Sequence, residues 1–261
     1  MQPHKIASNG FQNPENYELA RPRYPKESIE FIETILPPKA KIGEIGAGTG
    51  IFTRFLIESP CQYEVIAVEP VEGMRRKFKS SIPNVEIRDG TSWDTGLDDN
   101  SLDAVVVAQA FHWFDDIKSL QEFHRILKPG GQLLLIWNME SKENTRWVEE
   151  IRRLYEVYDA SAPQYRKGQW KQVFETDEAK ALFDLPLQFK KFDYPMPFIR
   201  DLIFPRIASK SYIAVLSDKE KENLCQQIDL VLDNPEYGFK TDDKGNFIYP
   251  HDTDLVWCQK K

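Results

Sequence analysis

The sequence contains few cysteines, and this limits how the fold can be stabilised. The three present, Cys61, Cys225 and Cys258, are odd in number and far apart. Neither a disulfide framework nor a metal site built from closely spaced cysteines is indicated. A chain of this kind suits a reducing compartment, so we expect a cytoplasmic protein without a bound metal.

An excess of basic residues is also missing. Lysine and arginine together number 34 against 41 acidic residues, which gives a formal net charge of -7. Nucleic-acid binding normally requires a basic face. The densest basic cluster, Arg75 to Lys79, falls on a predicted helix and is typical of a solvated surface. No nucleic-acid partner is therefore predicted.

Long apolar runs are missing as well. The longest are the length of a strand, so no membrane span is predicted, and the first ten residues lack the apolar core of a signal peptide. There is no internal repeat and no low-complexity tract. Apolar residues nevertheless make up 41% of the 261 residues, which is enough for one large α/β domain.

The most informative feature that is present is the segment GEIGAGTG at residues 43–50. A short apolar stretch, Lys41 to Ile45, runs into three alternating glycines, and a helical pattern begins directly afterwards. Glycine permits a sharp turn and close approach of a ligand to the backbone, because no Cβ intervenes. Nineteen residues beyond Gly50, a second apolar stretch ends in Glu69, where a carboxylate can accept hydrogen bonds from both hydroxyls of a ribose.

The spacing of these glycines separates two classes of nucleotide site. Dinucleotide sites usually read G-x-G-x-x-G and place a pyrophosphate on the helix N-terminus. Here the run is G-x-G-x-G, preceded by Glu44, whose carboxylate would repel a pyrophosphate but attract an ammonium or sulfonium group. This pattern disfavours an NAD(P)-dependent oxidoreductase, which remains an alternative.

Strand and helix patterns alternate over the first half of the chain. A helix is expected over Lys26 to Leu36, and further helices are expected after Pro70 and over Ile117 to Leu127. Expected strands cover Lys41 to Ile45, Val65 to Val68, Val85 to Arg88, Leu102 to Gln109 and Gln132 to Trp137. This alternation predicts a Rossmann-like, doubly wound and mainly parallel sheet with its ligands at the carboxyl ends of the strands.

Beyond residue 139 the pattern changes. We expect helices over Asn144 to Tyr158 and Lys171 to Phe183, then a strand over Leu187 to Tyr194. A helical region from about Phe198 to Leu232, interrupted near Pro205, and a final strand over Asp254 to Cys258 complete a seven-stranded sheet. We interpret these helical segments as additions to one sheet and not as an independent domain.

Five segments, GEIGAGTG, AVEPVEGM, RDGTSWD, LDAVVVAQAFHWFDD and RILKPGGQLLLIW, occur in an order that resembles the class I S-adenosylmethionine (SAM) methyltransferases. The segment AQAFHWFD and the opening from Tyr17 to Pro25 resemble a methyltransferase type 11 subgroup that includes trans-aconitate methyltransferases. The resemblance covers about residues 11–138. One departure is Trp93, which stands where the family commonly has an acid.

The resemblance implies a single SAM-dependent domain over residues 1–261. Residues 1–38 would form a lid and helix, residues 39–138 the cofactor-binding core, and residues 139–261 the substrate-side additions and last strands. SAM would be the cofactor and S-adenosylhomocysteine the product. The implied cofactor-binding residues are Tyr17, Arg21, Glu44, Gly46, Ala47, Gly48, Glu69, Pro70, Met74, Gly90, Thr91, Ser92, Gln109 and Ala110.

The acceptor site is expected from strand ends and from the later additions. His112 follows the fourth strand and is the candidate general base, with positioning as its alternative role. The expected substrate-binding residues are Trp113, Trp137, Asn138, Arg166 and Tyr212, and Arg206 is the alternative to Arg166. Because arginine holds carboxylates well, a small carboxylic acid or another oxygen nucleophile is the expected acceptor. The sequence is also compatible with a SAM-binding protein that transfers no methyl group, and with a methyltransferase that acts on protein or RNA.

Overall fold

The computed structural model describes residues 23–143, 145–159 and 162–261. Seven strands form one sheet in the order β3-β2-β1-β4-β5-β7-β6. Their bounds are β1 Lys41–Ile45, β2 Glu64–Val68, β3 Glu86–Arg88, β4 Leu102–Ala108, β5 Leu127–Glu140, β6 Phe183–Ile199 and β7 Asn246–Lys260. The pairings from β3 across to β5 are parallel, whereas β7 runs antiparallel to both β5 and β6. The predicted Rossmann-like, mainly parallel, seven-stranded sheet is confirmed.

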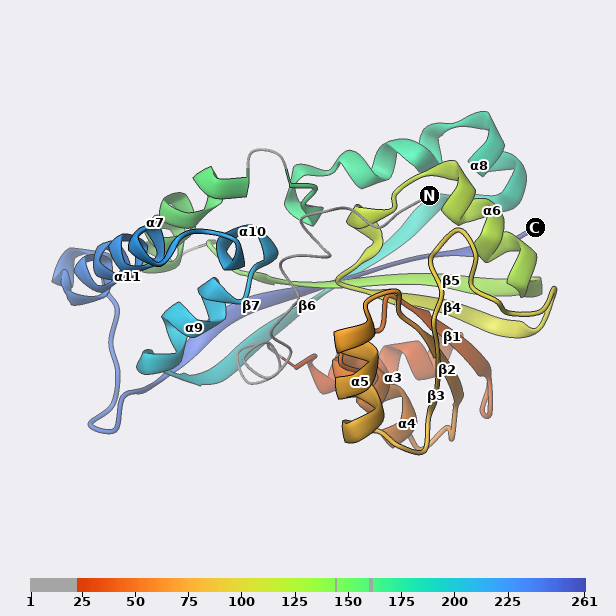
Figure 1. The fold of residues 1–261 in the computed structure, drawn as a ribbon, viewed down its shortest axis with the longest axis horizontal. Coiled ribbons are helices and arrows are strands. Elements are labelled where there is room, and N and C mark those ends of the chain that lie inside the picture. The colour runs from red at the N-terminus through yellow and green to blue at the C-terminus, as the bar shows by residue number, and fades with distance from the viewer. Residues whose placement is uncertain (1–22, 144, 160–161) are drawn as a thin grey trace.

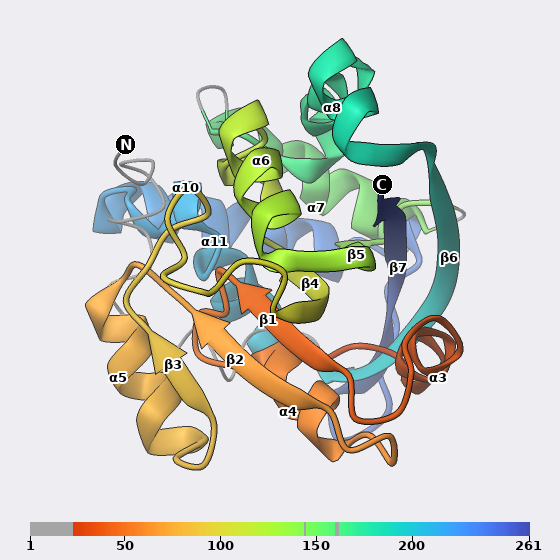
Figure 2. The ribbon, with the colours of Figure 1, turned by 90° about the vertical axis from the view of Figure 1, so that its right-hand side faces the viewer.

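Helices cover both faces of the sheet, as Figures 1 and 2 show. On one face, α3 (Lys26–Ile35) and α4 (Ile51–Glu58) bury residues such as Ile32, Phe52 and Leu56 against β1, β4 and β5. The helix α5 (Glu72–Ser81) packs Phe78 near β2 and β3.

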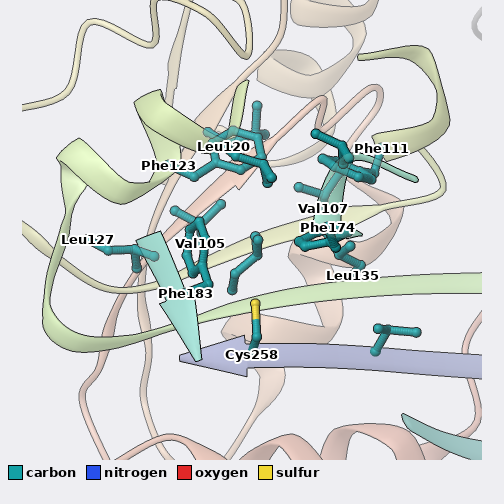
Figure 3. Close-up of a cluster of buried hydrophobic side chains, with 14 of the residues drawn as sticks. Val105, Val107, Phe111, Leu120, Phe123, Leu127, Leu135, Phe174, Phe183 and Cys258 are labelled. Atoms are coloured by element: carbon teal, nitrogen blue, oxygen red, sulfur yellow. The ribbon is translucent and has the colours of Figure 1, made fainter. Parts of the chain in front are cut away.

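On the other face, α6 (Ile117–Ile126) and α8 (Asp177–Leu182) cover β4, β5 and β7. Figure 3 shows Phe123 and Phe183 converging on Val105 of the central strand β4. β4 is buried on both faces, which explains its near-continuous run of apolar residues.

The later helices gather at one end of the sheet. Figure 1 shows α7 (Arg146–Glu156), α9 (Ile203–Ala208), α10 (Ser211–Ala214) and α11 (Asp218–Asp233) together beside the far ends of β6 and β7. They share an apolar cluster in which Trp147, Ile207 and Leu224 pack against Tyr249 of β7. This cluster fixes α9 and α10 beside the carboxyl end of β5.

Several expected boundaries were wrong. The strand expected over Gln132 to Trp137 runs from Leu127 to Glu140: Leu127 pairs with Leu102 of β4, and β7 pairs with β5 as far as the match between Glu140 and His251. The strands β6 and β7 are likewise much longer than expected, since backbone hydrogen bonds pair the two strands along almost their whole length. The helix expected over Lys171 to Phe183 is 3-10 helix over Gln169–Glu175, followed by α8.

Pro205 does not interrupt its helix. It is the third residue of α9, where the backbone N–H groups have no partner within the helix, so proline loses no hydrogen bond there. The interruptions fall instead on either side of α10.

Candidate active site

Three adjoining clefts open at the carboxyl ends of the parallel strands. Cleft A, with about 800 Å³ of space including open solvent, is lined by Ile45, Gly46, Gly48, Glu69, Pro70, Val71, Met74, Gly90, Thr91, Ser92, Trp93, Ala108, Gln109, Ala110, Trp113 and Phe114. Cleft B is lined by Tyr24, Glu44, Gly46, Ala47, Gly48, Thr49, Ile51, Phe52, Ala108 and Gln109. Cleft C is lined by Gln109, His112, Trp113, Asn138, Met139, Gln164, Tyr165, Arg206, Lys210 and Ser211.

The glycine run forms the wall between clefts A and B. Gly46 and Gly48 have positive φ angles of 74° and 58°, which most side chains disfavour. Gly50, with φ at 85°, has a second constraint: a Cβ there would lie 2.5 Å from Ile82 Cδ1. Gly46 and Gly48 thus line the clefts, while Gly50 serves close packing of the loop on α5.

Glu69 lies at the end of β2 and is held by the loop that it faces. Its Oε2 accepts a hydrogen bond from the Gly48 N–H at 3.0 Å, and its Oε1 accepts one from the Val71 N–H at 2.8 Å. Burial raises the pKa of this carboxyl, and the two amide donors oppose the rise. The carboxylate is therefore fixed in the wall of cleft A, with lone pairs left for hydroxyl donors.

The far wall of cleft A comes from the turn that follows β3, over Gly90 to Trp93. Thr91 Oγ1 accepts hydrogen bonds from the backbone N–H groups of Trp93 and Asp94, which shapes this turn. Ser92 Oγ accepts a hydrogen bond from the Ser119 hydroxyl at 2.9 Å, and the Trp93 indole N–H donates to Asp116 at 2.8 Å. Trp93 thus contributes a flat aromatic wall at the position where the acid of the resembled family is missing.

Glu44 forms the floor of cleft B and is almost fully buried. Burial raises its pKa to about 8, although the Thr53 hydroxyl, which donates to Oε2 at 2.6 Å, opposes the rise. The hydroxyl of the neighbouring Thr49 is buried and has no hydrogen-bond partner among the described residues. A buried acid beside an unused hydroxyl suits a ligand that carries both an ammonium group and a carboxylate.

Gln109 lines all three clefts. It follows β4 directly and adopts φ at 58°, an uncommon angle for a residue with a Cβ. Its backbone N–H donates to the carbonyl of Ile136 at 2.8 Å, and its side-chain amide donates to the carbonyl of Asn138 at 3.1 Å. The two contacts to β5 hold the residue in this conformation, so the junction of the clefts is built on a restrained backbone.

His112 lies in cleft C on a short 3-10 helix, Phe111–Trp113, and is mostly buried. The indole N–H of Trp137 lies 3.3 Å from His112 Nδ1 and donates to it. A neutral imidazole that accepts at Nδ1 carries its proton on Nε2. This geometry favours a positioning or hydrogen-bond-donating role for His112 over that of a general base.

Glu140, at the end of β5, organises the charged side of cleft C. It is 1% exposed and lies 2.8 Å from Arg206 Nη2 and 3.0 Å from Lys210 Nζ. Burial alone would raise the pKa of Glu140, but the two cations hold it well below its usual range. Beside them, burial and then the Arg206 charge lower the pKa of His251 to about 3, so this imidazole is neutral at neutral pH.

The structure brings most of the predicted site residues together. Those in clefts A and B are Glu44, Gly46, Ala47, Gly48, Glu69, Pro70, Met74, Gly90, Thr91, Ser92, Gln109 and Ala110. Trp113 and Asn138 line cleft C. Tyr17 and Arg21 lie outside the described residues.

Three predicted substrate-binding residues are placed elsewhere. Trp137 is fully buried under cleft C, stacked on Tyr165 with ring centroids 4.3 Å apart, because β5 turns this side chain into the core. Arg166 is bound to the carboxylates of Asp159 and Glu156. Tyr212 is buried in the apolar cluster of the later helices. Trp137 and Tyr212 support the wall from behind, and Arg166 is engaged outside it.

The sequence interpretation missed other lining residues. Thr49 lies within the glycine run and Tyr24 within the opening segment from Tyr17 to Pro25, so both motifs could have identified them. Lys210 and Gln164 lie in later segments that also resemble the family, but only the packing of those segments brings the two residues to cleft C.

Within the described ranges, no group of three or more histidine, cysteine or carboxylate side chains is arranged to hold a metal ion. The same part of the chain contains no helix long and apolar enough to cross a membrane.

The comparisons with known proteins agree on one family. Residues 43–135 match a family model described as a methyltransferase domain. A methyltransferase-like protein of Schizosaccharomyces pombe is 33% identical over 221 residues, which are 82% of each chain. A methyltransferase of Mycobacterium tuberculosis is 41% identical over 136 residues, 52% of this chain and 54% of that protein.

Solved structures share the fold. A phosphoethanolamine N-methyltransferase of Haemonchus contortus, in complex with phosphomonomethylethanolamine and S-adenosylhomocysteine, matches with a TM-score of 0.55 and 16% identity. The match covers 96% of this chain and 57% of that one.

Proposed function

The chain belongs to the SAM-dependent methyltransferases, and we propose that it transfers the methyl group to an oxygen of a small-molecule acceptor, in the first place a carboxylic acid. In this assignment residues 39–138 hold the cofactor, while residues 139–261 supply most of the acceptor side. The S-adenosylhomocysteine product leaves from the same clefts.

The residues of clefts A and B fit SAM. Glu69 offers acceptors for the ribose hydroxyls, and the space between Met74 and Trp93 suits an adenine ring. In cleft B, the acid of Glu44 and the buried hydroxyl of Thr49 match the ammonium and carboxylate of the methionine part. SAM supplies the reactive methyl group and its own leaving group. The protein's task is then to align the acceptor with the methyl carbon and to exclude water.

The observation that carries the proposal is the continuity of cleft C with cleft A. Gln109 and Trp113 line both, so an acceptor in cleft C reaches the cofactor at this junction. The lining of cleft C comes partly from Arg206 and Lys210, which favours an anionic molecule.

The geometry around His112 favours an acceptor that needs no general base. Its Nδ1 accepts from Trp137, which leaves the proton on Nε2, so the ring donates a hydrogen bond in place of removing a proton. A carboxylate is already ionised at neutral pH and requires no deprotonation before transfer. A phenol, or an amine in its ammonium form, would require it.

The test is a screen with radiolabelled SAM against small carboxylic acids, phenols, thiols and amines. We expect base-labile methyl esters from one or more carboxylic acids. The matched control is Glu69→Ala assayed at the same SAM concentration, which lowers turnover for every acceptor because it acts on cofactor binding.

Turnover confined to amines or thiols would contradict the oxygen acceptor and leave the methyltransferase assignment in place. SAM binding without turnover of any member of the four classes would favour a SAM-binding protein that transfers no methyl group.

A further inference from the structure

Arg206 is the most deeply buried cation in the wall of cleft C. It lies on α9, and only 2% of its surface is exposed. The apolar cluster that includes Ile203 and Ile207 fixes this helix and therefore the place of Arg206 in the wall. Moving a cation out of water is costly, and a fold retains one only where partners compensate for the loss.

The partners that the structure supplies account for one nitrogen. Arg206 Nη2 lies 2.8 Å from Glu140 Oε1 and 3.4 Å from His251 Nε2. Nε and Nη1 are buried and have no hydrogen-bond partner among the described residues. A guanidinium has five N–H donors, so the three at Nε and Nη1 remain unused. Buried donors are nearly always paired, which points to a missing acceptor.

A second cation lies beside Arg206 in the wall of cleft C. Lys210 also contacts Glu140, through Nζ at 3.0 Å from Oε1 and 3.3 Å from Oε2. His251 is neutral at neutral pH. Two cations therefore share the Glu140 carboxylate, and an anion that enters cleft C meets both of them.

The other residues of cleft C narrow the class of that anion. Trp113 and Tyr165 give it aromatic walls, and Gln164 and Ser211 add polar side chains. A small organic acid satisfies both features: its carboxylate pairs with the cation, and its carbon skeleton packs on the rings.

We propose that Arg206, with Lys210 beside it, is the anion anchor of cleft C, where it binds a carboxylate of the acceptor. Glu140 is the positioning residue that holds both cations in the wall. This inference rests on the proposed function for the identity of the cleft, but it concerns binding and not methyl transfer.

The test is calorimetry on the full chain saturated with S-adenosylhomocysteine. Benzoate is the probe, and benzamide is its uncharged counterpart of nearly the same shape. We expect benzoate to bind at least tenfold more tightly than benzamide. Arg206→Lys keeps the charge opposite Glu140 but removes the planar fan of donors, so it should abolish most of this preference.

Two controls separate the anchor from general effects. Arg166→Lys, at the arginine already bound to Asp159, should leave the benzoate preference unchanged. Affinity for S-adenosylhomocysteine, which should stay within about twofold in both variants, shows that the protein is folded. The comparison of benzoate with benzamide on the unaltered protein needs no variant and stands even where Arg206→Lys fails to fold.

Equal binding of benzoate and benzamide, or a preference that survives in Arg206→Lys, would overturn the anchor. Tight binding of inorganic phosphate without binding of benzoate would overturn the choice of a carboxylate. These results are independent of turnover, so they stay distinct from a failure of the proposed methyl transfer.

Discussion

The cofactor side and the acceptor side of this crevice are built in opposite ways. In cleft A, the functional carboxylate of Glu69 is already held by the backbone N–H groups of Gly48, in the glycine turn, and of Val71, two residues after Glu69. In cleft C, the functional cations come from α9 and from the residue that precedes α10, and both meet a carboxylate on β5. The first side is a local arrangement completed by the backbone, and the second is a long-range arrangement of side chains with donors left unused.

This difference indicates which parts of the chain determine cofactor recognition and which determine acceptor recognition. A cofactor common to a whole family can be met by glycines and one acid, whose positions follow from a strand, a turn and a helix. An acceptor that differs between members requires charged side chains, and these are carried by the segments that are added after β5. Substitutions at four positions test this contrast, ordered from the largest expected effect to the smallest.

Removing the charge of Glu140 should cost the most. In Glu140→Gln, Arg206 and Lys210 lose their buried counter-ion, and the free energy of unfolding should fall by about 3–5 kcal/mol. Glu72→Gln is the matched control, since its pair with Arg76 is exposed and should matter little. Urea unfolding at pH 7 measures both.

The same carboxylate predicts an acid limit of stability. The folded-state pKa of Glu140 is depressed, so its contribution is present above the unfolded value near 4.5 and is lost as the pH falls below it. If Glu140→Gln and Glu72→Gln lose the same free energy of unfolding, the acceptor side does not depend on the ion pairs of Glu140 with Arg206 and Lys210.

Replacing Glu69 tests the cofactor side. Glu69→Ala removes the charged acceptor for the ribose hydroxyls and should weaken SAM binding by roughly 1–3 kcal/mol. Asp89→Ala is its control, because Asp89 is exposed and pairs with Arg75 outside the cleft lining. Calorimetry with SAM, S-adenosylhomocysteine and NAD should show weak NAD binding in all three proteins. Unchanged affinity in Glu69→Ala would refute the ribose assignment.

Cofactor affinity should also depend on pH through Glu44. Its pKa is raised to about 8 by burial, so the free protein holds it protonated at neutral pH, and an ammonium ligand must displace that proton. Affinity for SAM should therefore rise roughly tenfold, about 1.4 kcal/mol, between pH 6 and pH 7. Glu44→Gln should give a flat profile, and a slope retained in that variant would exclude Glu44 as its source.

The stability of the ligand-free protein should move the other way. Because the folded pKa of Glu44 exceeds the unfolded value of 4.5, its stabilising contribution is complete below that value and is lost as the pH rises through about 8. Thermal unfolding of the parent and of Glu44→Gln without ligand measures this contribution.

The smallest effect is expected behind the acceptor wall. Trp137→Phe removes the indole N–H that donates to His112 Nδ1 and should lower kcat/KM for the acceptor by roughly fivefold, about 1 kcal/mol. SAM affinity should not change. Trp257→Phe is the control, since Trp257 packs on Phe31 on the opposite face of the sheet. A change in SAM affinity with kcat/KM intact would reverse the contrast between the two sides.

The sequence predicts the cofactor half well, for a physical reason. Buried parallel strands and glycine turns are determined over a few residues, so a ligand site shared by the glycine run and Glu69 can be predicted from their spacing. The ends of β6 and β7 could not be predicted in this way, because each continues as long as the other is there to pair with it. The same limitation explains Trp137, whose strand position was right but whose side chain faces the core.

The arginine assignment shows the limit most clearly. Arg166 and Arg206 look alike in sequence, each with aromatic and hydroxyl residues nearby. Only packing distinguishes them: Arg166 meets two carboxylates, each shared with another cation, whereas Arg206 meets one and has Nε and Nη1 without a partner among the described residues. No local pattern records how many acids a cation will find in the fold.

The position of β7 has a consequence for the order of assembly. β7 comes after every other strand in the chain, yet it lies between β5 and β6 in the sheet. β6 consequently has no partner in the sheet until β7 is in place. During synthesis, the strands from β1 to β5 can pair early, while β6 must wait with its backbone groups unpaired and open to other chains. Closure of cleft C is then a late folding event, and slow or failed docking of β7 would yield molecules that hold the cofactor before they can select an acceptor.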